Sequence, residues 1–343
     1  MIDPSLQYPV IEPLTVANSD ATEDLVLEVE GLTVSFPGLF KTVKAVRGID
    51  LKVRRGEILG LVGESGSGKS MTAMSCLGLM PETARLGGNV KVAGKQLNGA
   101  SASQLAALRG GGAAMIFQNP MKALNPFFTV GRQMFDVIGC HRQLSKAQIR
   151  AEAQSALEAV SMPDPPLALA KYPHQMSGGQ LQRVVIAMAL ACRPKLLIAD
   201  EPTTALDVTV QAQIIALLRK LAREQDLAIL FITHDLGVVA SLCDRVAVMY
   251  AGEVVESGPV GQVFKRPAHP YTLKLMGTVP KLGLGRQSLD FIPGQVPNMA
   301  APPAGCAFNP RCERATERCD QAVPRVTLDK GHWAACHNTL VTV

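Results

Sequence analysis

The sequence predicts an α/β fold built on a parallel sheet with helical crossovers, and three observations support this. Short apolar strands alternate with helical segments along most of the 343 residues, an order that is typical of parallel sheets. A helical stretch at residues 131–192 interrupts the alternation and indicates a helical subdomain. The hydrophobic content is 47% with only 4% aromatic residues, which favours a large aliphatic core between covered sheet faces.

The individual elements follow from hydrophobic periodicity. Residues 25–36 alternate well enough to predict a pair of strands, and residues 43–53 predict another strand. Farther along the chain we expect strands at 57–62, 114–117, 196–199 and 228–232, and helices within 131–162 (clearest at 146–160), after Ser177 and at 208–225.

Composition marks two boundaries. Residues 1–24 are acidic and carry three prolines without a clear period, so we expect a flexible N-terminal extension. The main α/β domain is expected at 25–258. Beyond it prolines cluster and four of the eight cysteines fall within 306–336, which predicts a small C-terminal domain at 259–343.

Charge and hydropathy exclude several classes of protein. A net charge of +5 falls short of the strongly basic signature of nucleic-acid binders, so no nucleic-acid partner is expected. No apolar run reaches the roughly 18–20 residues that span a bilayer, and the N-terminus does not resemble a secretory signal. We therefore expect a cytoplasmic protein in which disulfides are rare.

A phosphate loop lies between the strand at 57–62 and the helix after it. The segment Gly63-Glu64-Ser65-Gly66-Ser67-Gly68-Lys69-Ser70 fits the pattern G-x-x-x-x-G-K-[ST]. Its glycines let backbone N–H groups point at phosphates, and the helix presents its positive end to them. Lys69 would neutralise phosphate oxygens, and the Ser70 hydroxyl would bind Mg²⁺. A glycine-rich loop without a ligand is the alternative interpretation.

A second candidate anion site is the turn Ser177-Gly178-Gly179-Gln180, hereafter the signature turn, which opens a helix. It offers a hydroxyl, flexible backbone N–H groups and a helix N-terminus. An ordinary helix cap at Ser177 would look the same.

Two adjacent acids follow the strand at 196–199. Asp200 is expected at the carboxyl edge of the sheet beside the phosphate loop, where it can hold Mg²⁺. Glu201 is expected to point elsewhere, which suits a group that orients the attacking water. An acid pair of this kind alone could also be a helix cap.

The order of phosphate loop, Gln118, signature turn, Asp200-Glu201, Asp207 and His234 resembles the ATP-binding cassette (ABC) family. The resemblance implies an ABC-type P-loop ATPase domain, with a mixed sheet, an antiparallel β-subdomain and a helical subdomain. It also implies ATP hydrolysis, with two ATP molecules buried between two such domains. The signature turn of each domain would then complete the ATP site of its partner.

The resemblance carries roles over to individual residues. Asp200 matches the Walker B acid, Glu201 the catalytic glutamate and Gln118 the Q-loop glutamine near Mg²⁺. His234 matches the switch histidine at the γ-phosphate, and Asp207 the D-loop aspartate at the dimer interface. Mg²⁺ would be held by Ser70, Gln118 and Asp200. The implied ATP-binding residues are Phe36, Gly63, Glu64, Ser65, Gly66, Ser67, Gly68, Lys69, Ser70, Met71 and Asp200.

The adenine contact has two candidates. Phe36 precedes the phosphate loop by 27 residues, where the family has an aromatic residue that stacks on adenine. Phe40 competes for this role, and Phe36 could equally be a core residue of a strand.

Four short motifs resemble the first ATPase subunit of bacterial dipeptide and oligopeptide permeases. They are Phe117-Gln118-Asn119-Pro120, Leu124-Asn125-Pro126, Tyr172-Pro173-His174-Gln175, and His269-Pro270-Tyr271-Thr272 followed by Val279-Pro280. Nickel and opine importers share this branch. Asn119 replaces a common Asp and Met176 a common Leu, and neither change removes a catalytic group.

This branch implies a set of partners. They are a second ABC ATPase subunit of a different sequence, two multi-span membrane permeases and, indirectly, an extracytoplasmic substrate-binding protein. The location implied is peripheral, on the cytoplasmic face of the bacterial inner membrane. A soluble non-transport ABC ATPase is the alternative, but translation-type members carry two cassettes and repair-type members a long coiled coil, and this chain has neither.

The C-terminal cysteines predict a metal site. Cys306, Cys312, Cys319 and Cys336 have five, six and sixteen residues between them, and four thiolates in a cytoplasmic protein suit Zn²⁺ or an iron–sulfur cluster. The resemblance implies a structural [4Fe–4S] cluster, with zinc and unligated thiols as alternatives. The other cysteines (Cys76, Cys140, Cys192 and Cys243) are expected in the core.

Overall fold

The computed structural model describes residues 24–204, 206–278, 291–329 and 331–341. The expected N-terminal extension, except for its last residue, and the Val279-Pro280 pair lie outside the described residues.

A mixed eight-stranded sheet forms the centre of the molecule, with the strand order β11-β12-β10-β9-β3-β8-β7-β6. Its middle strands pair in parallel and its C-terminal strands pair antiparallel. The parallel strands are β3 (Ile58–Val62), β6 (Ala113–Ile116), β7 (Leu196–Asp200), β8 (Ala228–Thr233) and β9 (Arg245–Tyr250). The antiparallel strands are β10 (Glu253–Pro259), β11 (Arg325–Asp329) and β12 (His332–Ala335).

Both faces of this sheet are buried, as the aliphatic composition predicts. Along β8, Ile229 and Phe231 pack into one hydrophobic cluster, whereas Leu230 and Ile232 pack into another on the opposite face. The first cluster includes residues of α7 (Gly178–Leu190) and α8 (Val208–Glu224). The alternation of side chains along each strand therefore fixes a core on either side of the sheet.

A four-stranded antiparallel sheet, ordered β2-β1-β4-β5, packs beside the second cluster. It consists of β1 (Leu25–Pro37), β2 (Thr42–Arg54), β4 (Arg85–Val92) and β5 (Lys95–Gln96). The prediction of two strands within 25–36 is wrong, because this segment is one long strand. Its pairing with β2 shifts register at several points, so the strand bends without ending.

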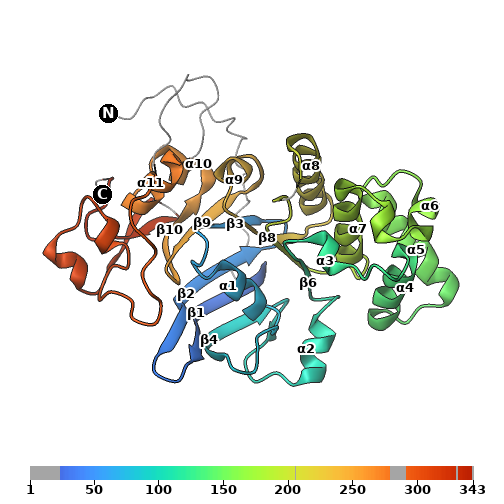
Figure 1. The fold of residues 1–343 in the computed structure, drawn as a ribbon, viewed down its shortest axis with the longest axis horizontal. Coiled ribbons are helices and arrows are strands. Elements are labelled where there is room, and N and C mark those ends of the chain that lie inside the picture. The colour runs from blue at the N-terminus through green and yellow to red at the C-terminus, as the bar shows by residue number, and fades with distance from the viewer. Residues whose placement is uncertain (1–23, 205, 279–290, 330, 342–343) are drawn as a thin grey trace.

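The helical stretch forms one end of the molecule (Figure 1, right). It contains α3 (Pro120–Ala123), α4 (Val130–His141), α5 (Lys146–Ala159), α6 (Pro165–Ala170), the 3₁₀ turn η1 (Pro173–Gln175) and α7. Side-chain caps start its helices, with Thr129 before α4 and Ser145 before α5. Cys140 on α4 is exposed, so the prediction that it lies in the core is wrong, whereas Cys76 and Cys192 are buried.

The remaining helices lie on the two sides of the main sheet (Figure 1). On the side of the antiparallel sheet are α1 (Lys69–Ser75) and α2 (Ala102–Leu108). On the other side are α8, α9 (Leu236–Leu242), α10 (Val260–Lys265) and α11 (Pro270–Gly277).

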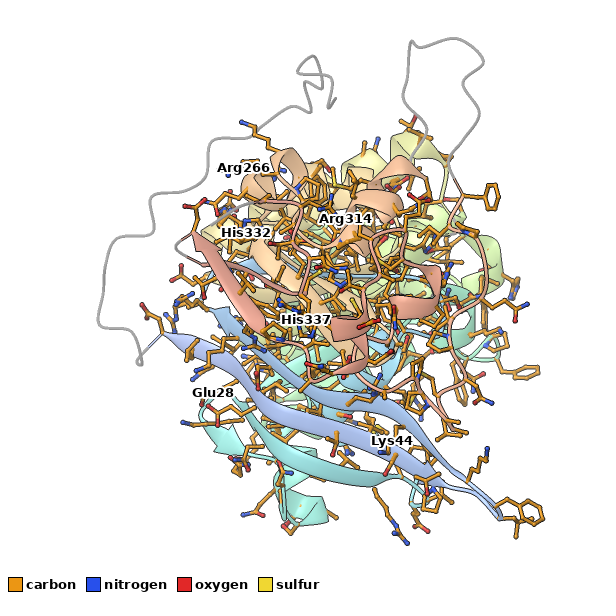
Figure 2. The ribbon with its side chains drawn as sticks, turned by 90° about the vertical axis from the view of Figure 1, so that its left-hand side faces the viewer. Glu28, Lys44, Arg266, Arg314, His332 and His337 are labelled. Carbon is orange, nitrogen blue, oxygen red and sulfur yellow. The ribbon has the colours of Figure 1, made fainter. Side chains whose placement is uncertain are left out.

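The C-terminal segment continues the main sheet (Figure 1, left; Figure 2 faces this end). β12 pairs with β10 through Glu256 and Ser257, and the 3₁₀ turns η2 (Asn309–Arg311) and η3 (Glu317–Asp320) precede it. β10 runs across residue 258, where the composition changes. Whether 259–343 is an independent domain stays a prediction.

Among the described residues, none of the helices combines the length and the apolar character needed to cross a bilayer.

Candidate active site

The phosphate loop connects β3 to α1 at the carboxyl edge of the main sheet. All five residues of β3 are buried, so the strand holds the start of the loop rigidly. Gly68 caps α1 in a left-handed conformation with φ 102°. The backbone N–H groups at the start of α1 can therefore face a phosphate group.

Close backbone contacts at two positions explain why only glycine fits. A Cβ atom on Gly63, whose φ is +152°, would lie 2.0 Å from the carbonyl oxygen of Met249. A Cβ atom on Gly68 would lie 2.5 Å from the carbonyl oxygen of Ala45. The loop is thus enclosed by backbone from β9 and β2, and its path leaves no room for side chains at these points.

Lys69 is buried inside the loop. Its Nζ donates hydrogen bonds to the carbonyl oxygens of Gly63 (2.8 Å) and Glu64 (2.9 Å). Burial lowers the pKa of Lys69, and the carboxylates of Glu201, Asp200 and Glu64 oppose this shift. The ammonium group therefore lies among acidic side chains, and a phosphate oxygen can compete with the loop carbonyl oxygens for its hydrogen bonds.

Asp200 ends β7 and is 8% exposed. Burial raises the pKa of its carboxyl group and the neighbouring Glu201 adds to this, while a hydrogen bond from Ser70 and the charge of Lys69 oppose it. The hydroxyl of Ser70 therefore lies on the side of the carboxylate of Asp200. Two hard oxygen donors at the end of the phosphate loop fit the ligand preference of Mg²⁺.

Glu201 has three side-chain partners, of which Thr204 is in its own loop and Gln118 and His234 come from two other loops. Gln118 donates from Nε2 to Oε2 of Glu201 (2.7 Å), and Thr204 donates from Oγ1 to the same atom (3.0 Å). His234 Nδ1 lies 3.1 Å from Oε1. Burial favours the neutral acid, but the hydrogen bonds outweigh it, so the pKa of Glu201 lies below its ordinary value. The structure therefore brings together an ionised carboxylate and the two residues that the sequence singled out.

The signature turn and Asp207 act as helix caps within the single chain. Ser177 accepts a hydrogen bond from the Gln180 N–H (3.3 Å), and the Gln180 side chain accepts one from the Ser177 N–H (3.2 Å). Asp207 accepts a hydrogen bond from the Val210 N–H (2.9 Å) and starts α8. Both segments keep the helix N-termini in defined positions.

The two adenine candidates differ in exposure. Phe36 is half-buried near the end of β1 and packs against the core cluster beneath the antiparallel sheet. Phe40 lies at the tip of the hairpin that joins β1 to β2 and is 96% exposed.

Sequence reasoning did not assign a role to three residues that contact this site. Thr204 stands in the segment after Glu201, and its hydroxyl helps to orient that carboxylate. Tyr271 and Arg311 approach the phosphate loop from the C-terminal segment and contact Glu64. The motif His269-Pro270-Tyr271-Thr272 singled out Tyr271 only as a family resemblance, and no local pattern pointed to Arg311.

The four C-terminal cysteines converge from separate turns. Burial and the three neighbouring thiols raise the pKa of Cys336 to about 11. Backbone N–H groups point at the sulfur atoms, for example from Thr316 to Cys319 (3.5 Å) and from Asn338 to Cys336 (3.2 Å). Within the described residues, however, no three Cys, His, Asp or Glu side chains gather closely enough to hold one metal ion.

Comparisons with known proteins agree with this geometry. Residues 46–204 match the ABC transporter family, and residues 255–319 match the oligopeptide/dipeptide transporter C-terminal region. The chain is 47% identical over 327 residues to the oligopeptide transport ATP-binding protein OppD of Escherichia coli (strain K12), covering 95% of this chain and 97% of that protein. It is 48% identical over 305 residues to the dipeptide transport ATP-binding protein DppD of Bacillus subtilis (strain 168), covering 88% and 91%.

Solved structures give the same family. The dimeric ATP-binding cassette MJ0796, in a post-hydrolysis state bound to ADP and Pi, is 28% identical with a TM-score of 0.61, covering 68% of this chain and 98% of that chain. The protein cbiO1 from Clostridium perfringens, part of the ABC transporter complex cbiONQ, is 30% identical with a TM-score of 0.61, covering 71% of this chain and 92% of that chain. This chain therefore belongs to the ATP-hydrolysing ATP-binding subunits of the ABC transporter family, in the branch that carries the oligopeptide/dipeptide transporter C-terminal region.

Proposed function

We propose that this chain hydrolyses ATP between two ATPase subunits and thereby powers the import of di- or oligopeptides. The observation that carries the hydrolytic part is the convergence of Gln118, Thr204 and His234 on Glu201, beside the Asp200 carboxylate and the phosphate loop. The names of the relatives, which are oligopeptide and dipeptide transport proteins, support the substrate.

The proposed chemistry is an in-line attack of water on the γ-phosphate. Glu201 orients the water and accepts its proton, because its low pKa keeps it ionised at neutral pH. Lys69 and the loop amides stabilise the negative charge on the β- and γ-phosphates. Ser70, Asp200 and Gln118 would hold Mg²⁺, which supplies charge neutralisation between these phosphates when bound. His234 contacts the γ-phosphate.

The half-buried Phe36 is the residue we propose for the adenine. It lies near the end of β1, where it packs against the core cluster and leaves part of its surface free for stacking. The 96% exposed Phe40 has no comparable support from the core.

A second ATPase subunit would complete the site. The signature turn offers its Ser177 hydroxyl and the N-terminus of α7 as an anion site, and this chain already carries one anion site in its own phosphate loop. We propose that the signature turn faces the ATP of the partner subunit, with Asp207 at the interface. The dimeric state named for the MJ0796 cassette supports this arrangement.

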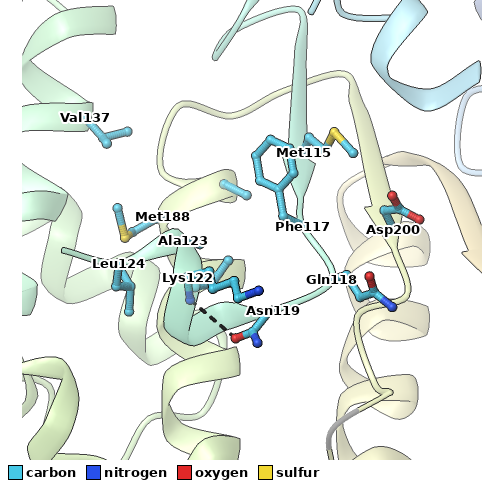
Figure 3. Close-up of a pocket in the computed structure, with 12 residues that line it drawn as sticks. Met115, Phe117, Gln118, Asn119, Lys122, Ala123, Leu124, Val137, Met188 and Asp200 are labelled. Atoms are coloured by element: carbon cyan, nitrogen blue, oxygen red, sulfur yellow. Dashed lines mark hydrogen bonds between the residues drawn. The ribbon is translucent and has the colours of Figure 1, made fainter. Parts of the chain in front are cut away.

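The permease contact is proposed for the surface that follows Gln118. A cavity of about 740 Å³ opens there, lined on one side by Phe117 and on the other by Leu124 and Met188, with Gln118 at the end toward Asp200 (Figure 3). The neighbouring Phe127 is 84% exposed. An apolar cavity that reaches the Q-loop glutamine can couple an inserted permease segment to the ATP site. The protein would accordingly be peripheral, on the cytoplasmic face of the bacterial inner membrane.

The four C-terminal cysteines are proposed to hold a [4Fe–4S] cluster. Burial and the neighbouring thiols raise the pKa of Cys306, Cys312 and Cys336, so these thiols lie near enough to interact. Backbone N–H groups donate to the sulfur atoms of Cys319 and Cys336, as they could to cluster ligands. Four cysteines in one short segment can supply the four thiolate ligands of such a cluster, and zinc is the alternative. The cluster would cross-link the turns of this segment. Broad visible absorbance of anaerobically purified protein supports the proposal, and a colourless protein with stoichiometric zinc contradicts it.

The transport proposal is tested by affinity purification of the full chain from solubilised membranes. We expect two multi-span proteins and a second ATPase to co-purify with the chain. After reconstitution with the substrate-binding protein, we expect peptides to stimulate ATP hydrolysis. Stimulation by Ni²⁺ or opines alone would assign one of those substrates instead, and the absence of membrane partners would contradict transport.

The docking surface has its own test. Phe127→Asp should abolish capture of the permeases while leaving ATP binding by the isolated chain unchanged. Leu39→Asp, at a 98% exposed position on the hairpin between β1 and β2, is the matched control and should leave capture intact. Capture of permeases by Phe127→Asp at the wild-type level would contradict this surface.

A further inference from the structure

Glu64, the second residue of the phosphate loop, is held from two directions. Its carbonyl oxygen accepts hydrogen bonds within the loop, from Ser67 N–H (3.2 Å) and Lys69 Nζ (2.9 Å). Its N–H donates to the Tyr271 hydroxyl (3.0 Å), and its carboxylate accepts from Arg311 Nη1 (3.1 and 3.2 Å). The two residues from the C-terminal segment therefore fix the outer side of a loop whose inner side holds Lys69.

Arg311 is built to remain in one position. Its side chain is only 5% exposed. Nε donates to the carbonyl oxygen of Pro293 (2.9 Å), Nη2 to that of Ile292 (3.0 Å), and Nη1 also to the Tyr250 hydroxyl (3.2 Å). The guanidinium lies over the Tyr250 ring, 5.8 Å from its centroid. A buried charge with this many fixed partners cannot follow a moving loop and instead holds the loop in place.

An aromatic cluster joins the two contacts. The rings of Tyr250 and Tyr271 have centroids 4.6 Å apart, and Phe308 packs against both at 5.2 and 5.3 Å. Phe308 immediately precedes the turn η2 that carries Arg311, and Tyr271 lies on α11. Both contacts to Glu64 thus come from one packed unit, which includes β9 of the main sheet and the cysteine-bearing turns.

The phosphate-loop pattern itself does not require this contact, because the residue after the first glycine is variable. The carboxylate of Glu64 pairs with the guanidinium of Arg311, which would otherwise be a buried cation without a negatively charged partner in this ion pair. Catalytic groups lie elsewhere, with Glu201 held by Gln118, Thr204 and His234. The contact should therefore affect ATP binding more than the chemical step.

We propose that Arg311 and Tyr271 are positioning residues of the ATP site, which hold the phosphate loop in its binding conformation from the C-terminal segment. This inference rests on the proposed binding of ATP by the loop. It assigns the C-terminal segment a role in nucleotide affinity.

The test is a set of substitutions in the full chain, measured by ATP titration and by the KM and kcat of the assembled ATPase. Arg311→Met removes a charged hydrogen bond and should raise the KM for ATP by about tenfold. Tyr271→Phe removes a neutral hydrogen bond and should raise this KM by about fivefold. In both variants kcat should change less than twofold. Arg318→Met, at an exposed position in the same segment, is the matched control and should leave KM unchanged.

A double-mutant cycle distinguishes positioning from general stability. In the Glu64→Gln background the effect of Arg311→Met on KM should shrink, because the partner charge is already lost. Additive effects, or an unchanged KM in both Arg311→Met and Tyr271→Phe, would overturn the proposal. If Arg311→Met fails to fold, Tyr271→Phe and Glu64→Gln preserve the packing and carry the test.

Lys69→Ala separates this inference from the proposed ATP site. One outcome would overturn only the positioning role. In that outcome the wild type binds ATP, Lys69→Ala does not, and the Arg311 and Tyr271 variants keep the wild-type KM for ATP. Equal ATP affinity of the wild type and Lys69→Ala would contradict the ATP site itself.

Discussion

Replacing Gly178 by alanine isolates the contribution of the signature turn to a partner's ATP site. In the single chain a Cβ atom at Gly178 would meet only Leu206 Cδ2, at 4.0 Å, so the fold has room for it. Gly178 is the first residue of α7, where alanine is the better helix former by at most about 1 kcal/mol. Stability and ATP binding by the isolated chain should therefore be unchanged or slightly improved.

Across an interface the same methyl group would obstruct the approach of a phosphate to the backbone N–H groups of α7. Loss of one such donor from a charge-stabilising site costs about 10²–10³-fold in rate. We expect a loss of this size in the hydrolysis rate of the site that the signature turn completes. Gly261→Ala in α10, where a new Cβ atom would meet nothing within 4 Å, is the matched control.

The assay combines the thermal unfolding and ATP affinity of the isolated chain with the ATPase rate of the assembled complex. Wild-type hydrolysis by a complex that carries Gly178→Ala would refute the reasoning. Loss of ATP binding by the isolated chain would also refute it, because the turn would then act within its own subunit.

Two further predictions follow from the site and from the cysteines. Thr204→Val removes a hydrogen bond that lowers the pKa of Glu201, so this pKa should rise. The acid limb of the pH profile of kcat should then move to higher pH, with little change in kcat at neutral pH. An unmoved acid limb would exclude this contact as a determinant of the pKa. Cys312→Ser should abolish the visible absorbance expected of the cluster and lower the melting temperature. Cys140→Ser, at an exposed thiol, is the control and should change neither property. Full absorbance in Cys312→Ser would contradict the proposed ligand set.

Local sequence was sufficient to predict the elements that carry the site. The strands that end at Asp200 and before His234 are short, fully buried apolar runs, so their type and direction follow from composition and from the crossovers between them. The phosphate loop follows from its glycines, whose positions are fixed by the close approach of β2 and β9.

Contacts between distant segments could not be predicted in the same way. The Arg311–Glu64 pair joins residues 247 positions apart, and no periodicity in either segment indicates it. The pairing of β12 with β10 likewise depends on how the C-terminal segment returns to the sheet edge. Alternation at 25–36 predicted a pair of strands, whereas the register shifts between β1 and β2 bend one long strand without ending it, and local alternation does not indicate such shifts.

The central claim, that Glu201 activates water at an otherwise complete ATP site, is tested most directly with Glu201→Gln in the assembled complex. The amide keeps the shape of the side chain and removes the base, so ATP and Mg²⁺ should bind as in the wild type while phosphate release falls by about 10²–10⁴-fold. Phosphate release by Glu201→Gln at the wild-type rate would contradict the account.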